Sequence, residues 1–148
     1  MSHADPCNAV TQQGEFVDLV GSTGAPPKPS GGTIEDGTYV LTGLTLYTPS
    51  SKENGAKLAA LGKTTMEIKG TTTQLVRTSR DGVEQRTTVN RVNAGDDTTA
   101  TTTCVSPPAR ADEPTTAKFS ATGTSLLFIN PGPAGTAVAT YRKLAPAP

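Results

Sequence analysis

The sequence predicts an all-β protein whose eight antiparallel strands run up and down along the chain and close into a barrel. Between residues 39 and 144, short runs rich in Thr, Val and Leu alternate with turns of Gly, Asn, Asp or Pro. Such short connections join only neighbouring antiparallel strands. The chain also holds 26 threonines, whose branched side chains suit a pleated surface. An open sheet of eight strands would leave two long edges, which closure removes; a two-sheet β-sandwich is the alternative.

The individual strands follow from the alternation of side chains along the chain. In the first strand, Tyr39 and Leu41 are expected on one face and Leu44 on the other, and Gly43 predicts a bend or bulge. The longest connection follows this strand, and its second half, Ala56–Leu61, has the composition of one or two helical turns. The eight strands are expected at residues 39–48, 64–69, 73–79, 83–92, 98–105, 117–121, 125–129 and 137–144.

The chain divides into an irregular leader at residues 1–32, a barrel domain at 33–144 and a tail at 145–148. The apolar island from Phe16 to Val20 is expected to add a short strand to a sheet edge. The beginning Met-Ser-His shows no signal peptide, which indicates a trimmed or engineered N-terminus.

Two cysteines give the best indication of the compartment. Cys7 in the leader and Cys104 near the end of a strand have neither a CxxC motif nor a neighbouring His. We expect a disulfide between them that tethers the leader, because thin-cored, Thr-rich domains of this kind are usually exported. Closing so long a loop stabilises by up to about 4.7 kcal/mol on the chain-entropy argument. Two unrelated free thiols are the alternative. An exported location is therefore predicted: secreted, periplasmic or in the cell envelope.

Catalytic and metal-binding chemistry finds little support. The only histidine, His3, lies in the leader. We expect it to be a residue of a flexible terminus or a cloning remnant. A pair of a nucleophile and a histidine therefore cannot form in the barrel domain. Asp96 and Asp97 are adjacent acids beside Gly95 in a predicted hairpin turn, and turn chemistry is favoured there over a weak Ca²⁺ site. We therefore expect no enzyme, no catalytic residue, no metal and no cofactor.

The charged residues are expected mainly at the surface. Glu67 and Glu84 are expected to be solvated and paired with Lys69 or Arg86.

Thirteen basic residues balance thirteen acidic ones, which makes nucleic acid a poor partner. No apolar stretch is long enough to span a membrane. One hairpin concentrates four arginines, for which a charged outer face is favoured over a patch for an acidic partner or a gate: Arg77, Arg80, Arg86 and Arg91.

The layout of residues 31–144 resembles that of the lipocalin-like barrels of bacterial secreted and envelope proteins. A long opening strand after a Gly-Gly hinge (GGTIEDGTYVLT) precedes a long connection and a run of tight hairpins, and the segments TTATTTCVSP and AVATYRK add to the likeness. The Gly-x-Trp motif of classical lipocalins is missing, because the chain has no Trp. The resemblance implies a small closed barrel with its mouth under the connection at residues 49–63. It carries no ligand residues across.

Two functions fit such a barrel. The favoured one is a monomeric, non-enzymatic interaction or structural module with an unknown protein partner and an interior filled by its own side chains. The alternative is a carrier of a small apolar or amphipathic ligand, which needs a cavity of at least about 300 Å³. Its ligand would contact the inward-facing residues of the strands, expected as Tyr39, Leu41, Met66, Ile68, Phe119, Phe128 and Tyr141.

Overall fold

The structure is a computed structural model that describes residues 7–49, 54–106, 115–133 and 135–145. His3 and most of the predicted tail lie outside these residues. All regular elements of the described part are strands, which confirms the all-β prediction. The ten strands are β1 (Asp18–Ser22), β2 (Gly37–Tyr47), β3 (Lys57–Ala60), β4 (Lys63–Lys69), β5 (Thr72–Thr78), β6 (Glu84–Ala94), β7 (Asp97–Ser106), β8 (Thr115–Ala121), β9 (Ser125–Gly132) and β10 (Gly135–Lys143).

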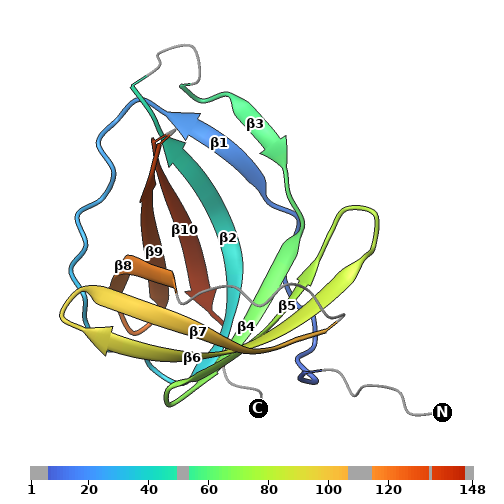
Figure 1. Cartoon of the computed structure of the whole chain (residues 1–148). Coiled ribbons are helices and arrows are strands. Elements are labelled where there is room, and N and C mark those ends of the chain that lie inside the picture. Colours follow the sequence, from blue (N-terminus) through green and yellow to red (C-terminus); the bar gives the residue numbers. More distant parts are fainter. Residues whose placement is uncertain (1–6, 50–53, 107–114, 134, 146–148) are drawn as a thin grey trace.

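The ten strands form one sheet that returns on itself (Figure 1). From β4 to β10 each strand pairs with its neighbour in the chain, and all these pairs are antiparallel. β2 then pairs with β4 on one side and with β10 on the other, from Tyr39↔Lys143 to Tyr47↔Thr136. The predicted pairing of the first and last long strands is thus confirmed, and eight strands make a ring.

Two strands were not among the eight expected. β1 pairs in parallel with β2 and antiparallel with β3, so the apolar island of the leader lies inside the sheet, and β3 takes the free edge. The predicted helical turns at Ala56–Leu61 were wrong, because β3 occupies that segment. Its backbone groups bond to β1, and this tertiary pairing outweighs a weak helix propensity.

A bulge in β2 decides which side chains face the inside of the ring. The register with β10 shifts so that Leu41 faces Tyr141 while Gly43 faces Thr140, which leaves Thr42 as the extra residue. The bulge expected at Gly43 is therefore present. Leu44 was expected on the face opposite Leu41, and this was wrong because an extra residue reverses the alternation. Both leucines belong to the inner side, where Leu44 packs against the core.

The core is a single cluster of buried apolar side chains on the inner face of the ring. Phe128 and Tyr141 meet edge to face, with ring centres 5.8 Å apart. The leader contributes Val17, whose backbone bonds to Leu61 and Gly62. The cluster contains Val17, Tyr39, Leu41, Met66, Ile68, Leu75, Phe119, Leu126, Phe128 and Tyr141.

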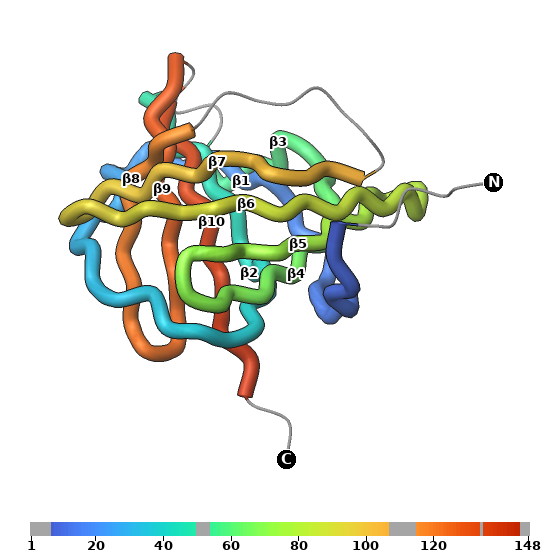
Figure 2. The backbone as a smooth tube through the Cα atoms, turned by 60° about the horizontal axis from the view of Figure 1, so that its bottom comes forward, coloured from blue at the N-terminus to red at the C-terminus, as the bar shows by residue number. Residues whose placement is uncertain are grey.

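The leader also covers part of the outer face of the sheet. Val10 is buried there together with Thr65 of β4 and Val76 of β5. The amide of Gln12 donates hydrogen bonds to the carbonyls of Lys63 and Val76 and to the Thr78 hydroxyl, and accepts one from Thr65. These bonds hold the leader against β4 and β5, where Figure 2 shows it passing close to both strands.

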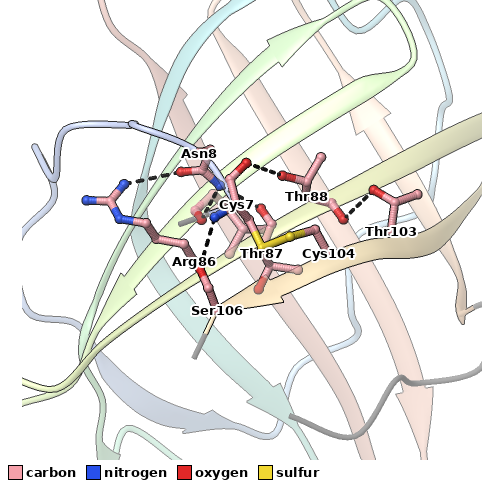
Figure 3. Close-up of a disulfide and its surroundings, with 9 residues drawn as sticks. Cys7, Asn8, Arg86, Thr87, Thr88, Thr103, Cys104 and Ser106 are labelled. Carbon is pink, nitrogen blue, oxygen red and sulfur yellow. Dashed lines mark hydrogen bonds between the residues drawn. A yellow bond between two sulfur atoms is a disulfide. The ribbon is translucent and has the colours of Figure 1, made fainter. Parts of the chain in front are cut away.

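A disulfide between Cys7 and Cys104 fastens the start of the described leader to β7, as predicted (Figure 3). The Cα atoms of the two cysteines are 5.7 Å apart. Around the bond, the Cys7 amide donates to the Ser106 hydroxyl and the Cys7 carbonyl accepts a hydrogen bond from the Thr88 hydroxyl. The leader is thus joined covalently and by hydrogen bonds to the β6–β7 pair.

Replacement of Gln12 by Ala is expected to lower the free energy of unfolding by about 1–3 kcal/mol, because its hydrogen-bond partners lose the amide that satisfies them. The matched control is Gln13→Ala, since the Gln13 side chain is exposed and only its backbone amide donates to Thr65. Urea denaturation of both variants measures the difference. Equal stability of the two would contradict the role given to the leader.

Loss of the disulfide is expected to lower the free energy of unfolding by about 2–5 kcal/mol, because the unfolded chain regains the entropy of a long loop. The double variant Cys7→Ser/Cys104→Ser and the reduced wild-type protein should give the same urea midpoint. A midpoint unchanged from that of the oxidised protein would show that the bridge does not constrain the unfolded chain.

Candidate functional site

The candidate site is a pocket of about 560 Å³ on the inner side of the ring. β2 pairs with β4 only from Gly37 to Val40. Beyond the bulge, β2 pairs with β1 instead, and β3 follows β1. The two extra strands thus separate β2 from β4 at this end of the ring (Figure 1). The pocket lies where the walls diverge, and it includes residues 61–63, the end of the connection that was expected to cover the mouth.

The two walls of the pocket differ in chemistry. The wall formed by β2 and β10 is apolar and consists of Leu41, Leu44, Ala139 and Tyr141. The facing wall comes from β4, β5 and β6 and carries polar groups. It consists of Lys63, Thr64, Arg77, Thr78 and Gln85. The remaining lining residues are Leu61, Gly62, Ser79 and Val83, of which Val83 is 60% exposed. A molecule in this pocket therefore meets an apolar surface on one side and hydrogen-bonding groups on the other.

The seven residues predicted to line a ligand site all belong to the inner core cluster. Two of them, Leu41 and Tyr141, line the pocket. The other five are buried in the core cluster and do not line this pocket: Tyr39, Met66, Ile68, Phe119 and Phe128.

Several pocket residues were missed by the sequence analysis. Leu44 was assigned to the outer face, and only the position of the bulge places it inside. Arg77 follows the inward-facing Leu75 by two residues, so strand alternation alone would have placed it inside. Its charge, which is typical of an outer face, obscured that signal.

The four arginines of the β5–β6 hairpin do not form one patch. Arg80 and Arg86 lie among outer partners, since Arg80 pairs with Asp18 at 2.8 Å and Arg86 pairs with Glu84 at 2.8 Å. Arg86 also donates to the Val10 carbonyl of the leader. The other two, Arg77 and Arg91, lie by strand alternation on the same side as Leu75 and Val89; Arg77 is exposed where it lines the pocket, and Arg91 contacts Phe128. The interpretation of all four as a charged outer face was therefore wrong for this second pair, because the strand period turns them inward.

Arg91 extends across the inside of the ring toward β9. Its guanidinium lies 4.5 Å from the ring centre of Phe128, a cation–π contact. Its Nε atom is buried and has no hydrogen-bond partner among the described residues. Burial lowers the pKa of Arg91, but a guanidinium keeps its proton in proteins.

Three of the four acidic residues considered for acid–base or metal chemistry have ordinary surface partners, whereas Glu67, expected to pair with Lys69, is exposed and forms no ion pair among the described residues. The predicted pairing of Glu84 with Arg86 is confirmed. Asp96 and Asp97 both bind the Lys118 ammonium, at 3.1 and 2.7 Å. Within the part of the chain that the structure describes, no group of three residues could hold a metal ion.

The stability of the protein is expected to fall as the pH rises above about 10, the pKa of an unfolded tyrosine. Burial raises the pKa of Tyr141, and the nearby Arg77 and Arg91 only partly oppose this effect. The folded state therefore favours the protonated phenol, a contribution that is complete below pH 10 and is lost above it. Tyr141→Phe should make the loss less steep. Urea denaturation between pH 8 and 11 measures it, and identical slopes in both proteins would contradict the assignment.

Comparisons of the chain with protein-family models, curated proteins and solved structures find no match. No helix that could cross a membrane occurs among the described residues. The geometry of the pocket and the placement of its charges are therefore the observations from which a function can be argued.

Proposed function

We propose that the protein is a non-enzymatic binding protein that takes a small apolar or amphipathic molecule into the pocket. The observation that carries this proposal is the pocket itself, whose volume of about 560 Å³ falls within the range of about 300–1,000 Å³ typical of ligand sites. A carrier needs such a cavity and a filled structural module does not. The apolar wall of β2 and β10 supplies the area for hydrophobic contact.

The fold proposed for this function is a lipocalin-like up-and-down barrel of eight strands. The ring of β2 and β4–β10 and the pairing of β10 with β2 support it. The disulfide supports export to the exterior, the periplasm or the envelope of a bacterium, because such bonds persist in oxidising compartments. We propose a monomer, since the ring pairs the long edges of β2 and β10 and only the four-residue β3 has a free edge among the described strands.

An interaction module is the second candidate, and one exposed residue favours it. Phe16 of the leader is 45% exposed. Its ring lies between the Lys63 ammonium and the Arg80 guanidinium, each 4.9 Å from its centre. An aromatic side chain held in place by cations is typical of the residues that dominate protein interfaces. This role predicts that Phe16→Ala weakens association with a protein partner and leaves the pocket ligand unaffected.

Partial filling of the pocket is expected to weaken ligand binding. Ala139→Trp places an indole against the apolar wall, whereas the matched control Thr140→Trp places one on the outer face of the same strand. Titration with the neutral fluorescent probe N-phenyl-1-naphthylamine, and its displacement by dodecanol, measures binding. Ala139→Trp should weaken probe binding by about tenfold or more, or about 1.4 kcal/mol, while Thr140→Trp binds as the wild type does.

Two results would overturn the carrier proposal. One is the absence of any probe binding to the wild-type protein. The other is equal binding by both Trp variants, which would place the probe elsewhere on the surface. Circular dichroism of the three proteins verifies that each variant keeps its strand content.

A further inference from the structure

Two arginines on the inward-facing side of β5 and β6, Arg77 and Arg91, have no carboxylate partner among the described residues. Arg77 lines the pocket, and Arg91 stacks on Phe128 in the core. None of the residues that line the pocket or form the core cluster is Asp or Glu. The described ion pairs all involve other cations, so neither Arg77 nor Arg91 has a carboxylate partner in this part of the chain.

Arg86 of the same protein differs from Arg77 and Arg91 because its guanidinium has several partners. The Arg86 guanidinium, on the outer face, bonds to the Asn8 amide oxygen, the Val10 carbonyl and the Glu84 carboxylate. A partly buried guanidinium with such partners is satisfied. Arg77 has no such partner among the described residues and is exposed where it lines the pocket, so its guanidinium is available to an anion there.

We propose that the pocket selects a ligand with an anionic head, which pairs with Arg77 and accepts a hydrogen bond from the Tyr141 hydroxyl, while the apolar part of the ligand lies against Leu41, Leu44 and Ala139. The ligand class is thus a single-chain anionic amphiphile. This inference rests on the proposed function and names the kind of molecule that the site takes. Arg77 and Tyr141 both line the same pocket, one from each wall.

Three features of the site fit an anion better than a neutral or cationic head. Arg77 offers planar, paired N–H donors that match an oxyanion. The other basic residue of the lining, Lys63, has its ammonium over the Phe16 ring, which leaves Arg77 as the cation without a described ring or carboxylate contact. Both arginines act electrostatically on the Tyr141 hydroxyl, so Arg91 adds positive potential from the core side.

Tyr141 is suited to donate rather than to accept. Burial raises the pKa of its hydroxyl, so the phenol keeps its proton under ordinary conditions and has a hydrogen to give. An anionic oxygen that accepts this hydrogen and those of Arg77 would be held between the two walls. The amphiphile would then lie with its head toward Arg77 and its chain along β2 and β10.

The test compares three probes that share one chain and differ in the charge of the head: dodecanoate, dodecanol and dodecylammonium. Displacement of N-phenyl-1-naphthylamine at neutral pH, below their critical micelle concentrations, gives the three dissociation constants. We expect dodecanoate to bind about tenfold or more tightly than dodecanol, and dodecylammonium to bind most weakly. Tenfold corresponds to about 1.4 kcal/mol, within the range of a hydrogen bond to a charged group.

Matched variants assign the preference to Arg77. Arg77→Gln should lose the preference for dodecanoate and keep the affinity for dodecanol, which also shows that the variant is folded. Arg77→Lys should keep part of the preference because it keeps the charge. Arg142→Gln is the control, since Arg142 follows Tyr141 on β10 but is exposed, and its preference should equal that of the wild type.

The outcomes separate this inference from the function on which it rests. If wild-type protein binds dodecanol and dodecanoate equally, or if Arg77→Gln keeps the preference, the pairing of an anionic head with Arg77 is refuted while the carrier proposal stands. If no amphiphile binds, the carrier proposal fails and this inference fails with it. A preference lost in Arg77→Gln and retained in Arg142→Gln supports the inference.

Discussion

The pairing of β10 with β2 is the constraint on which the rest of the structure depends. Eight residue pairs join the two strands, and they turn a row of hairpins into a ring with an inside and an outside. Only in a ring do the alternate side chains of every strand converge on one enclosed space. The pairing of β10 with β2 therefore brings together the residues of the core cluster, the residues of the pocket and the two inward arginines.

The leader packs on the outer face of the closed ring and also adds a strand to its sheet. Residues 8–13 cover the outer face of β4 and β5, Val17 enters the core, and β1 inserts between β2 and β3. By occupying the space beside the far half of β2, β1 and β3 separate it from β4. The same segment that stabilises the outside of the ring therefore opens its inside. The pocket and the docking of the leader therefore both result from the path of the same part of the chain.

Much of the fold was accessible from the sequence because its signals are local. Turn residues such as Asp81-Gly82 and the alternation around Met66 and Ile68 mark hairpins and strand faces directly. The disulfide followed from cysteine spacing and composition. Two features could not be predicted because they depend on non-local contacts. The pairing of Lys57–Ala60 with β1 has no local signal in the sequence. The exact position of the bulge at Thr42 reverses the faces of Leu44 and its neighbours. The pocket depends on both features, so its location could not be predicted even though seven members of the core could.

The position of the last strand has a consequence for how the protein is made. During synthesis, β2 is complete long before β10, and its edge from Tyr39 to Tyr47 stays without the partner that finally covers it until the C-terminal segment leaves the ribosome. An unpaired strand edge of this kind is a place where nascent chains associate wrongly. Cys104, by contrast, emerges before β8, β9 and β10, so the bond to Cys7 can form first. In an oxidising compartment, that bond would hold the leader against the β6–β7 pair before β10 closes the ring on β2.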